Sequence, residues 1–185
     1  MILNKKNNPR FHDTEQRMET AMLELMKTTD FEKITVKKIC ELAQVNRSTF
    51  YAHFLDIYDM LDKVERRLRR ELLESYKKEQ ENTIFSEESF IYFLKHIKKH
   101  QYFYRINLQT RKSFPIKAGY EQIWNIIEPR CRQAGITNDE EIMYYFINFQ
   151  AGFTMTLKHW VDTGCKLKEE EVAAIIRNCM PGILA

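Results

Sequence analysis

The sequence predicts an all-α protein built in two parts, and its composition and patterning agree on this. Apolar residues recur at helical spacing along most of the 185 residues. Only five Gly and four Pro occur, which leaves little room for the turns of a β-protein. The 44% hydrophobic and 30% charged residues are typical of a folded globular chain. We expect about nine helices, in a small N-terminal domain over residues 1–54 and a larger helical domain over residues 55–185.

The first helix is expected from about Asp13 to Thr28. Asp13 and Gln16 have the spacing of a capping box. The apolar residues between Met18 and Met26 then follow at intervals of three and four. The polar residues 1–12 are expected to form a disordered terminus, with a basic arm in a DNA minor groove as the alternative.

Two short helices with a tight turn follow. Thr35 is a good N-cap for a helix over Val36–Ala43, and Asn46 can cap a second helix after a turn at Gln44. Phe50 and Phe54 lie four residues apart and are expected to point inward. This helix-turn-helix pattern, with small hydrogen-bonding side chains at the start of its second helix, suits a DNA major groove.

The residues expected to contact DNA fall into two groups. Base edges are assigned to Arg47, Ser48 and Thr49, and Asn46, the cap that precedes them, is also expected among the DNA-binding residues. Phosphates are assigned to Thr35, Lys37, Tyr51 and His53.

The segment from Thr35 to Leu61 resembles the DNA-binding signature of the TetR family of transcriptional regulators. The matching positions are Thr35, Val36, Ile39, Ala43, Val45, Thr49, Tyr51, His53 and Phe54. The family usually has Gly where this chain has Gln44, so the left-handed turn expected there costs more. It commonly has Lys where this chain has Ile57, which removes one implied phosphate contact.

The remaining chain is expected to form the helical body of the protein. A long helix is predicted from about Asp56 to Glu79, and Ser86 caps the next one. Further segments are predicted over Tyr102–Leu108, Pro115–Gln133, Asp139–Thr163 and Glu169–Met180, with Asn138 as a cap and Gly135 and Gly164 as terminators.

The last two predicted helices carry more apolar surface than one partner face can cover, which predicts a two-fold homodimer. The predicted interface residues are Phe153, Leu157, Trp160, Val161, Val172, Ile175, Ile176 and Cys179. This region also resembles TetR regulators related to those of dihydroxyacetone kinase operons, through Phe149, Gly152, Lys158, Trp160, Thr163 and Gly164.

Aromatic residues concentrate in the second half of the chain, and they predict either a ligand pocket or an aromatic core. The candidate pocket residues are Phe93, Tyr102, Phe103, Tyr120, Trp124, Tyr145 and Phe149. No cofactor or metal is expected, although His96 and His100 are spaced to share a metal ion. No nucleophile elbow or phosphate-binding loop occurs, so an enzyme is not expected.

The net charge of +3 does not by itself indicate a nucleic-acid binder. The four Cys are widely spaced, and no signal peptide or apolar run of membrane-spanning length is found, so a reduced, cytoplasmic protein is expected. The resemblance implies a regulator that binds a palindromic operator in double-stranded DNA and releases it when an effector binds. Repression is the expected mode. Activation, control by a partner protein instead of a small molecule, and a helical interaction protein whose helix-turn-helix has lost its target are the alternatives.

Overall fold

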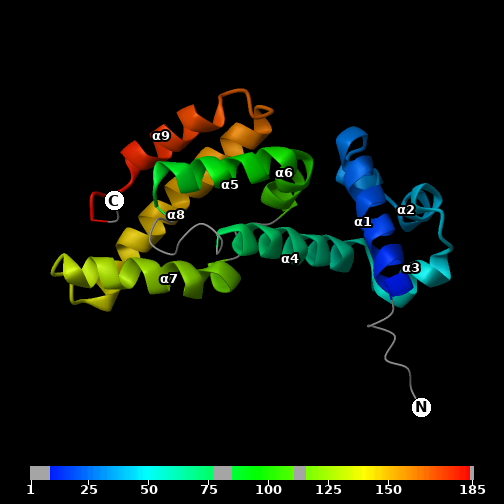
Figure 1. Ribbon diagram of the computed structural model, residues 1–185, viewed down its shortest axis with the longest axis horizontal. Coiled ribbons are helices and arrows are strands. Elements are labelled where there is room, and N and C mark those ends of the chain that lie inside the picture. Colours follow the sequence, from blue (N-terminus) through cyan, green and yellow to red (C-terminus); the bar gives the residue numbers. More distant parts are fainter. Residues whose placement is uncertain (1–8, 77–84, 111–115, 184–185) are drawn as a thin grey trace, which may run out of the picture. The chain divides into compact units, whose positions relative to one another are not determined.

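The computed structural model describes residues 9–76, 85–110 and 116–183, and these form helices and connecting turns without a strand (Figure 1). The elements are α1 (Pro9–Thr28), η2 (Phe31–Lys33), α2 (Val36–Ala43), α3 (Arg47–His53), α4 (Ile57–Tyr76), α5 (Glu87–Lys99), α6 (Gln101–Thr110), α7 (Ile116–Gln133), α8 (Asp139–Asp162) and α9 (Glu169–Cys179). The predicted all-α class is confirmed. The chain divides into two compact units, residues 1–75 and 76–185. The division therefore falls near the end of α4, whereas the sequence analysis placed it before α4.

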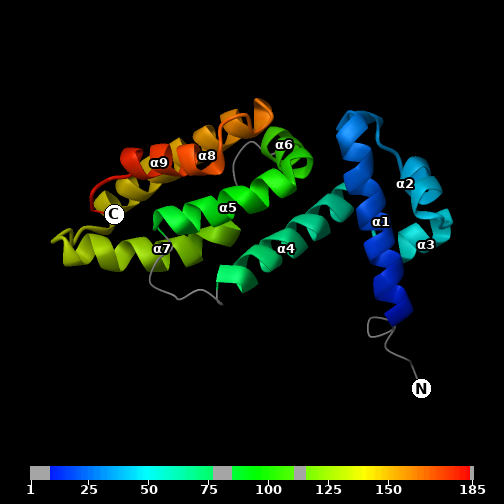
Figure 2. The same cartoon turned by 45° about the horizontal axis from the view of Figure 1, so that its top comes forward.

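In the first unit, α2 and α3 pack beside α1, as both ribbon views show (Figures 1 and 2). Helix α1 begins at Pro9, earlier than expected, because the fixed φ of proline suits the first turn of a helix. Asp13 therefore lies inside the helix and does not cap it. The expected stripe is buried, with Met18 and Met22 fully enclosed.

The two short helices carry the predicted caps. The Thr35 side chain accepts a hydrogen bond from the Lys38 backbone N–H at 3.3 Å, and the Asn46 side chain accepts one from the Thr49 N–H at 2.7 Å. Phe50 is fully buried and Phe54 is 1% exposed, as their spacing predicted. The starts of α2 and α3 are therefore both fixed by residues that lie close to them in sequence.

The turn between α2 and α3 depends on a residue far away in the sequence. Gln44 has φ 53° and ψ 49°, the left-handed conformation that the sequence analysis expected. The Arg17 guanidinium on α1 donates to the carbonyls of Ala43 (2.5 Å) and Gln44 (3.2 Å). These bonds satisfy carbonyl groups at the end of α2 and offset part of the cost of a side chain in this conformation.

His53 closes the same unit from the other end of α3. It is 8% exposed, and its ring stacks on Phe11 of α1 with centroids 3.7 Å apart. Burial lowers the pKa of His53 and outweighs the opposing effect of Glu15. The Lys63 ammonium on α4 donates to the His53 backbone carbonyl and lies 4.9 Å from the Phe54 ring centroid.

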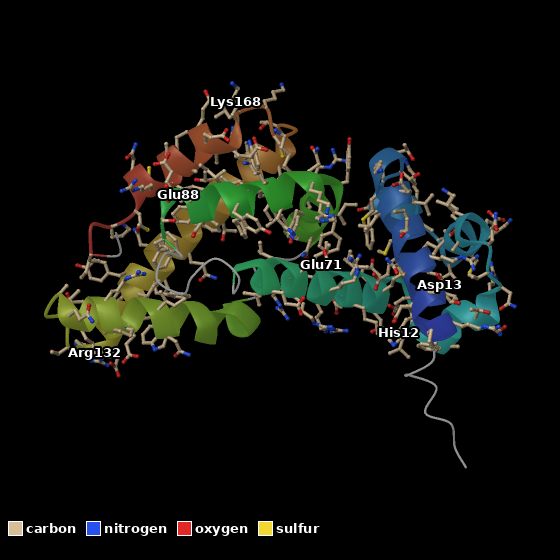
Figure 3. All side chains as sticks on the ribbon, in the orientation of Figure 1. His12, Asp13, Glu71, Glu88, Arg132 and Lys168 are labelled. Atoms are coloured by element: carbon tan, nitrogen blue, oxygen red, sulfur yellow. The ribbon has the colours of Figure 1, made fainter. Side chains whose placement is uncertain are left out.

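An ion pair joins α4 to α1. Arg67 Nε lies 2.5 Å from Glu19 Oε2, and Arg67 Nη1 lies 2.6 Å from Glu71, which Figure 3 labels on α4. Glu19 is 5% exposed, and its burial raises the pKa of the carboxyl despite the lowering by Arg67. A buried carboxylate needs this partner, so the pair fixes the register of α4 on α1.

In the second unit, α5 lies along α9, and α8 contacts α6, α7 and α9 (Figure 2). Ser86 and Asn138 cap α5 and α8 as predicted, by accepting from the Ser89 and Glu140 N–H groups. The Trp160 indole N–H donates to the Leu167 carbonyl at 3.0 Å and ties the turn after α8 to the helix. The predicted start at Pro115 lies outside the described residues. No helix in the described part of the chain is long and apolar enough to cross a membrane.

The strained turn makes a stability prediction. Gln44→Gly should raise the opening free energy of the α2 and α3 amides by about 0.5–1 kcal/mol, because glycine adopts a positive φ without steric cost. Gln16→Gly, at an exposed position inside α1, should instead lower stability by about 1 kcal/mol. Hydrogen exchange of the first unit measures both. A loss of protection in Gln44→Gly equal to that in Gln16→Gly would contradict the prediction.

The burial of His53 makes a pH prediction. A histidine whose pKa is lowered by folding binds fewer protons in the folded than in the unfolded state, so stability falls as the pH drops below about 6.5. Hydrogen exchange of α1 and α3 amides between pH 7.5 and 5, corrected for intrinsic exchange, should show this slope. His53→Gln should reduce it, and His12→Gln, at an exposed position labelled in Figure 3, should keep it. An unchanged slope in His53→Gln would refute the assignment.

Candidate nucleic-acid interface

The first turn of α3 presents three polar side chains next to one another. Arg47 and Ser48 are exposed and Thr49 is half-buried, and they occupy the first three helical positions after the Asn46 cap. The cap holds the backbone at the start of the helix in place. The predicted base-contacting residues therefore lie together on one exposed helix end.

Arg47 stands where a cation is least favoured within a helix. Its positive charge lies at the N-terminus, where the helix dipole is also positive. It makes no ion pair or hydrogen bond with any residue that the structure describes. Burial raises the pKa of the Cys40 thiol, and the positive charge of Arg47 opposes this rise. This guanidinium is available to an external acceptor.

The hydroxyl groups beside it compete for one acceptor. Asn46 Oδ1 accepts from Ser48 Oγ at 2.7 Å, from Thr49 Oγ1 at 2.8 Å and from the Thr49 N–H at 2.7 Å. An amide oxygen has two lone pairs, so three donors exceed its capacity. At least one hydroxyl can turn to another acceptor without loss of the cap.

The predicted phosphate-contacting residues are mostly exposed, with Thr35, Lys37 and Tyr51 at the surface. Tyr51 is 58% exposed and rests edge-on against Phe50. Lys37 lies 3.8 Å from Glu41 on α2, and both side chains are more than 60% exposed. A pair this exposed contributes little stability, so its lysine can exchange the carboxylate for a phosphate.

His53 does not belong to this exposed group. Its ring is buried against Phe11, and Nδ1 has no hydrogen-bond partner among the described residues. The predicted phosphate contact of His53 therefore disagrees with its place in the fold, because helix periodicity turned the ring toward α1. Its observed part is to hold the N-terminal end of α1 against α3.

The edge formed by the start of α4 is apolar. Ile57, at the position where the resembling family has lysine, is half-buried. Its neighbours Leu55 and Tyr58 are 82% and 64% exposed. Lys63 on α4 does not replace the missing lysine freely, because its Nζ lies 3.3 Å from Asp59 Oδ2.

Ring contacts among the described residues bring some of the predicted pocket residues close to one another. Phe93 and Phe149 both lie close to Phe153, with ring centroids 5.5 and 5.8 Å from it. Phe103 is 1% exposed against Tyr104, and Trp124 meets Phe146 edge-on. Tyr102 is 36% exposed, Tyr145 is half-buried, and the side chain of Tyr120 lies outside the described residues. His96 Nε2 lies 3.2 Å from the Tyr104 hydroxyl, and the described residues hold no group of three metal-ligating side chains.

Most of the predicted dimer-interface residues are core residues of a single chain. The buried ones are Leu157, Trp160, Val161, Val172 and Ile176, each 5% exposed or less. Phe153 is half-buried, and only Ile175 and Cys179 are exposed. The pattern predicted burial correctly but not its partner, because α5 covers the apolar face of α9 within the chain.

A different surface of α8 is exposed and apolar. Tyr144, Ile147 and Met155 are 67%, 51% and 62% exposed, and Ala151 and Gly152 lie exposed between them. This exposed stripe was not predicted from the sequence, because the apolar residues of the buried face of α8, such as Phe146 and Trp160, dominate the helical pattern. Arg17 was missed for another reason. Its contacts lie 26 and 27 residues away, and the only sequence signal was the absence of glycine at Gln44.

Comparisons with known proteins identify the second unit. Residues 86–182 match the C-terminal region of TetR-type transcriptional regulators. The solved structure of the dihydroxyacetone kinase operon activator DhaS is similar, with a TM-score of 0.57 and 16% sequence identity over 90% of this chain and 93% of that chain. This identity supports the fold alone. The chain has no match among curated protein sequences.

The family match covers more than half of the chain, and the fold is similar to that of a TetR-like regulator over 90% of the chain. The sequence resemblance carried by Thr35 to Leu61 is therefore confirmed at the level of the family. The chain belongs to the TetR family of transcriptional regulators.

Proposed function

We propose that this chain is a DNA-binding transcriptional regulator that binds a palindromic operator as a homodimer, works in the cytoplasm, and is released by an effector bound to its second unit. One observation carries the DNA-binding part. Arg47 is exposed and has no partner among the described residues, and it lies at a helix end that disfavours a cation. Beside it, the Ser48 and Thr49 hydroxyl groups share the single acceptor Asn46 Oδ1. Guanine edges and phosphates supply the missing acceptors.

The division of contacts follows from exposure and chemistry. Arg47, Ser48 and Thr49 read base edges, while Thr35, Lys37 and Tyr51 hold phosphates. Asn46 fixes the first turn of α3. His53 acts through its packing against Phe11 and is left out of the proposed phosphate contacts.

A homodimer accounts for the exposed stripe on α8. Tyr144, Ile147 and Met155 follow one another at helical spacing, and the small Ala151 and Gly152 allow close approach of a second helix. A two-fold axis beside this stripe would pair it with itself, and the resulting dimer would carry two copies of α3. Ile175 and Cys179 remain candidates for the rim of this interface.

We propose repression with effector release as the mode, since release of a bound dimer from DNA needs only a change in the spacing of its two α3 helices. The similar structure is described as an operon activator, so activation is the second candidate. Transcription in vitro from a promoter that carries the selected operator separates the two, because a repressor lowers the transcript level and an activator raises it.

The base-reading assignment predicts a difference between two substitutions. Arg47→Ala should reduce discrimination at one base-pair position of each half-site by roughly 10–100-fold, the value of a bidentate arginine contact. Tyr51→Phe should weaken binding to every operator variant by the same factor, because a phosphate contact carries no sequence information. Titrations of the full chain against a set of single-base operator variants measure both.

Arg70→Ala, an exposed arginine on α4, serves as the control for lost positive charge. It should leave the ranking of operator variants unchanged. Equal losses from Arg47→Ala and Tyr51→Phe across all variants would refute the assignment.

The proposed dimer predicts that Met155→Asp and Ile147→Asp weaken self-association by at least about tenfold, because each places two carboxylates at the self-paired stripe. Both side chains are more than half exposed, so the fold of one chain should survive. Leu42→Asp, at an exposed leucine of α2 (52% exposed), is the matched control. Sedimentation equilibrium gives the dimer dissociation constants. Unchanged constants for both α8 variants would exclude this interface.

A further inference from the structure

The second unit contains a cation for which the described residues supply no ion-pair partner. Arg130 on α7 is half-buried, and its Nη1 atom is buried without a hydrogen-bond partner among the described residues. No carboxylate in the described part of the chain forms an ion pair with it. The nearest acid along α7, Glu128, accepts from Arg132 Nε at 2.8 Å. Arg132, which Figure 3 labels, also forms an ion pair with Asp139.

Arg130 contacts an aromatic ring, and this contact supplies no acceptor for its buried Nη1 atom. Its guanidinium carbon lies 4.9 Å from the centroid of the Phe85 ring. A cation over an aromatic face is attracted by the electron-rich face of the ring. This attraction does not supply an acceptor for a buried N–H, and a guanidinium has five such donors and no acceptor of its own. A donor buried without an acceptor lowers stability, so its presence calls for an explanation.

An aromatic surface continues from this cation. The Phe85 ring meets Phe149 edge-on with centroids 5.4 Å apart, and Phe149 stacks on Phe153 at 5.8 Å with an angle of 25° between the rings. Phe85 is 8% exposed, whereas Phe149 and Phe153 are only half-buried. An apolar, partly open face of α8 therefore adjoins a guanidinium that has no ion-pair partner in the described part of the chain.

We propose that Arg130 and the rings of Phe85, Phe149 and Phe153 form the recognition site for a small organic carboxylate with an aromatic body. The carboxylate receives parallel N–H hydrogen bonds from the guanidinium, a geometry that arginine is suited to provide. The aromatic body rests on the half-buried phenylalanine rings. This inference deepens the proposed function, since it names the chemical class of the effector and rests on effector control of the second unit.

A carboxylate fits the site better than a phosphate group does. The structure places one cation at the rings, and its single charge balances one negative charge. Lys158, the lysine of α8 nearest in sequence to Phe153, is bound to Asp162. A phosphate dianion would lack a second cation among the described residues.

The experiment compares pairs of probes that differ only in charge. The full-length chain is titrated with benzoate, phenylacetate, indole-3-acetate and 2-naphthoate, and with the carboxamide of each. Calorimetry gives the dissociation constants, and thermal unfolding followed by tryptophan fluorescence reports the second unit, which contains both tryptophans. At least one carboxylate should bind about tenfold or more tightly than its carboxamide, the difference expected for a charge-assisted hydrogen bond.

Variants assign that difference to the site. Arg130→Met keeps the length of the side chain and should abolish the preference for the carboxylate, whereas Arg130→Lys should retain part of it. Arg177→Met, on the exposed side of α9, is the control and should bind as the wild type does. If no carboxylate binds more tightly than its amide, or if Arg130→Met keeps the preference, the proposal is wrong. The comparison in the wild type decides even if Arg130→Met fails to fold.

A parallel titration with operator DNA separates this inference from the proposed function. Operator binding without any carboxylate preference would overturn the inference alone. A carboxylate preference without DNA binding would overturn the proposed function and leave the binding site in place.

Discussion

The left-handed turn at Gln44 is the constraint on which the arrangement of the first unit depends. It redirects the chain after α2 so that Asn46 can cap α3 and Arg47 emerges at an exposed helix end. Glycine would adopt this conformation at no steric cost, whereas glutamine does so with a penalty. Arg17 offsets that penalty from α1 by binding two carbonyl groups of the turn. The direction of the recognition helix is therefore fixed by a contact between distant parts of the sequence.

The contacts within the same unit show how a movement of α4 can be transmitted to α3. Glu19–Arg67 ties α4 to α1, and Lys63 ties α4 to the last carbonyl of α3. The Phe31 and Tyr58 rings add a contact between η2 and α4 at 5.6 Å. A shift of α4 within the unit would have to break or carry these contacts. Because Glu19 is buried, loss of its partner is costly, and a coupled movement of α1 and α4 is favoured over separation.

What could be predicted from the sequence was local, and what could not was decided between distant residues. The caps at Thr35, Asn46, Ser86 and Asn138 each involve residues two or three positions apart, so spacing and residue type sufficed. The support of the turn by Arg17 and the pairing of Glu19 with Arg67 span 26 to 48 residues and leave no local pattern.

Burial was easier to predict than its partner. The apolar faces of α8 and α9 were recognised, but the pattern could not tell packing within one chain from packing between two chains. Leu157 and Val172 proved to be core residues, and the stripe around Met155 is the exposed one. For the same reason, the aromatic residues could be assigned to the second unit but not to one cluster. Only the three-dimensional fold brings Phe85 beside Phe149 and places Arg130 over the face of the Phe85 ring.

The central claim is that two copies of α3, held by one homodimer, read a duplex together. Selection of bound duplexes from a random pool with the full-length chain at low salt tests it most directly. The account predicts an inverted repeat whose half-sites lie a whole number of helical turns apart, on the order of 10 base pairs per turn. Recovery of a single unrepeated motif, or of no enriched sequence at all, would contradict it.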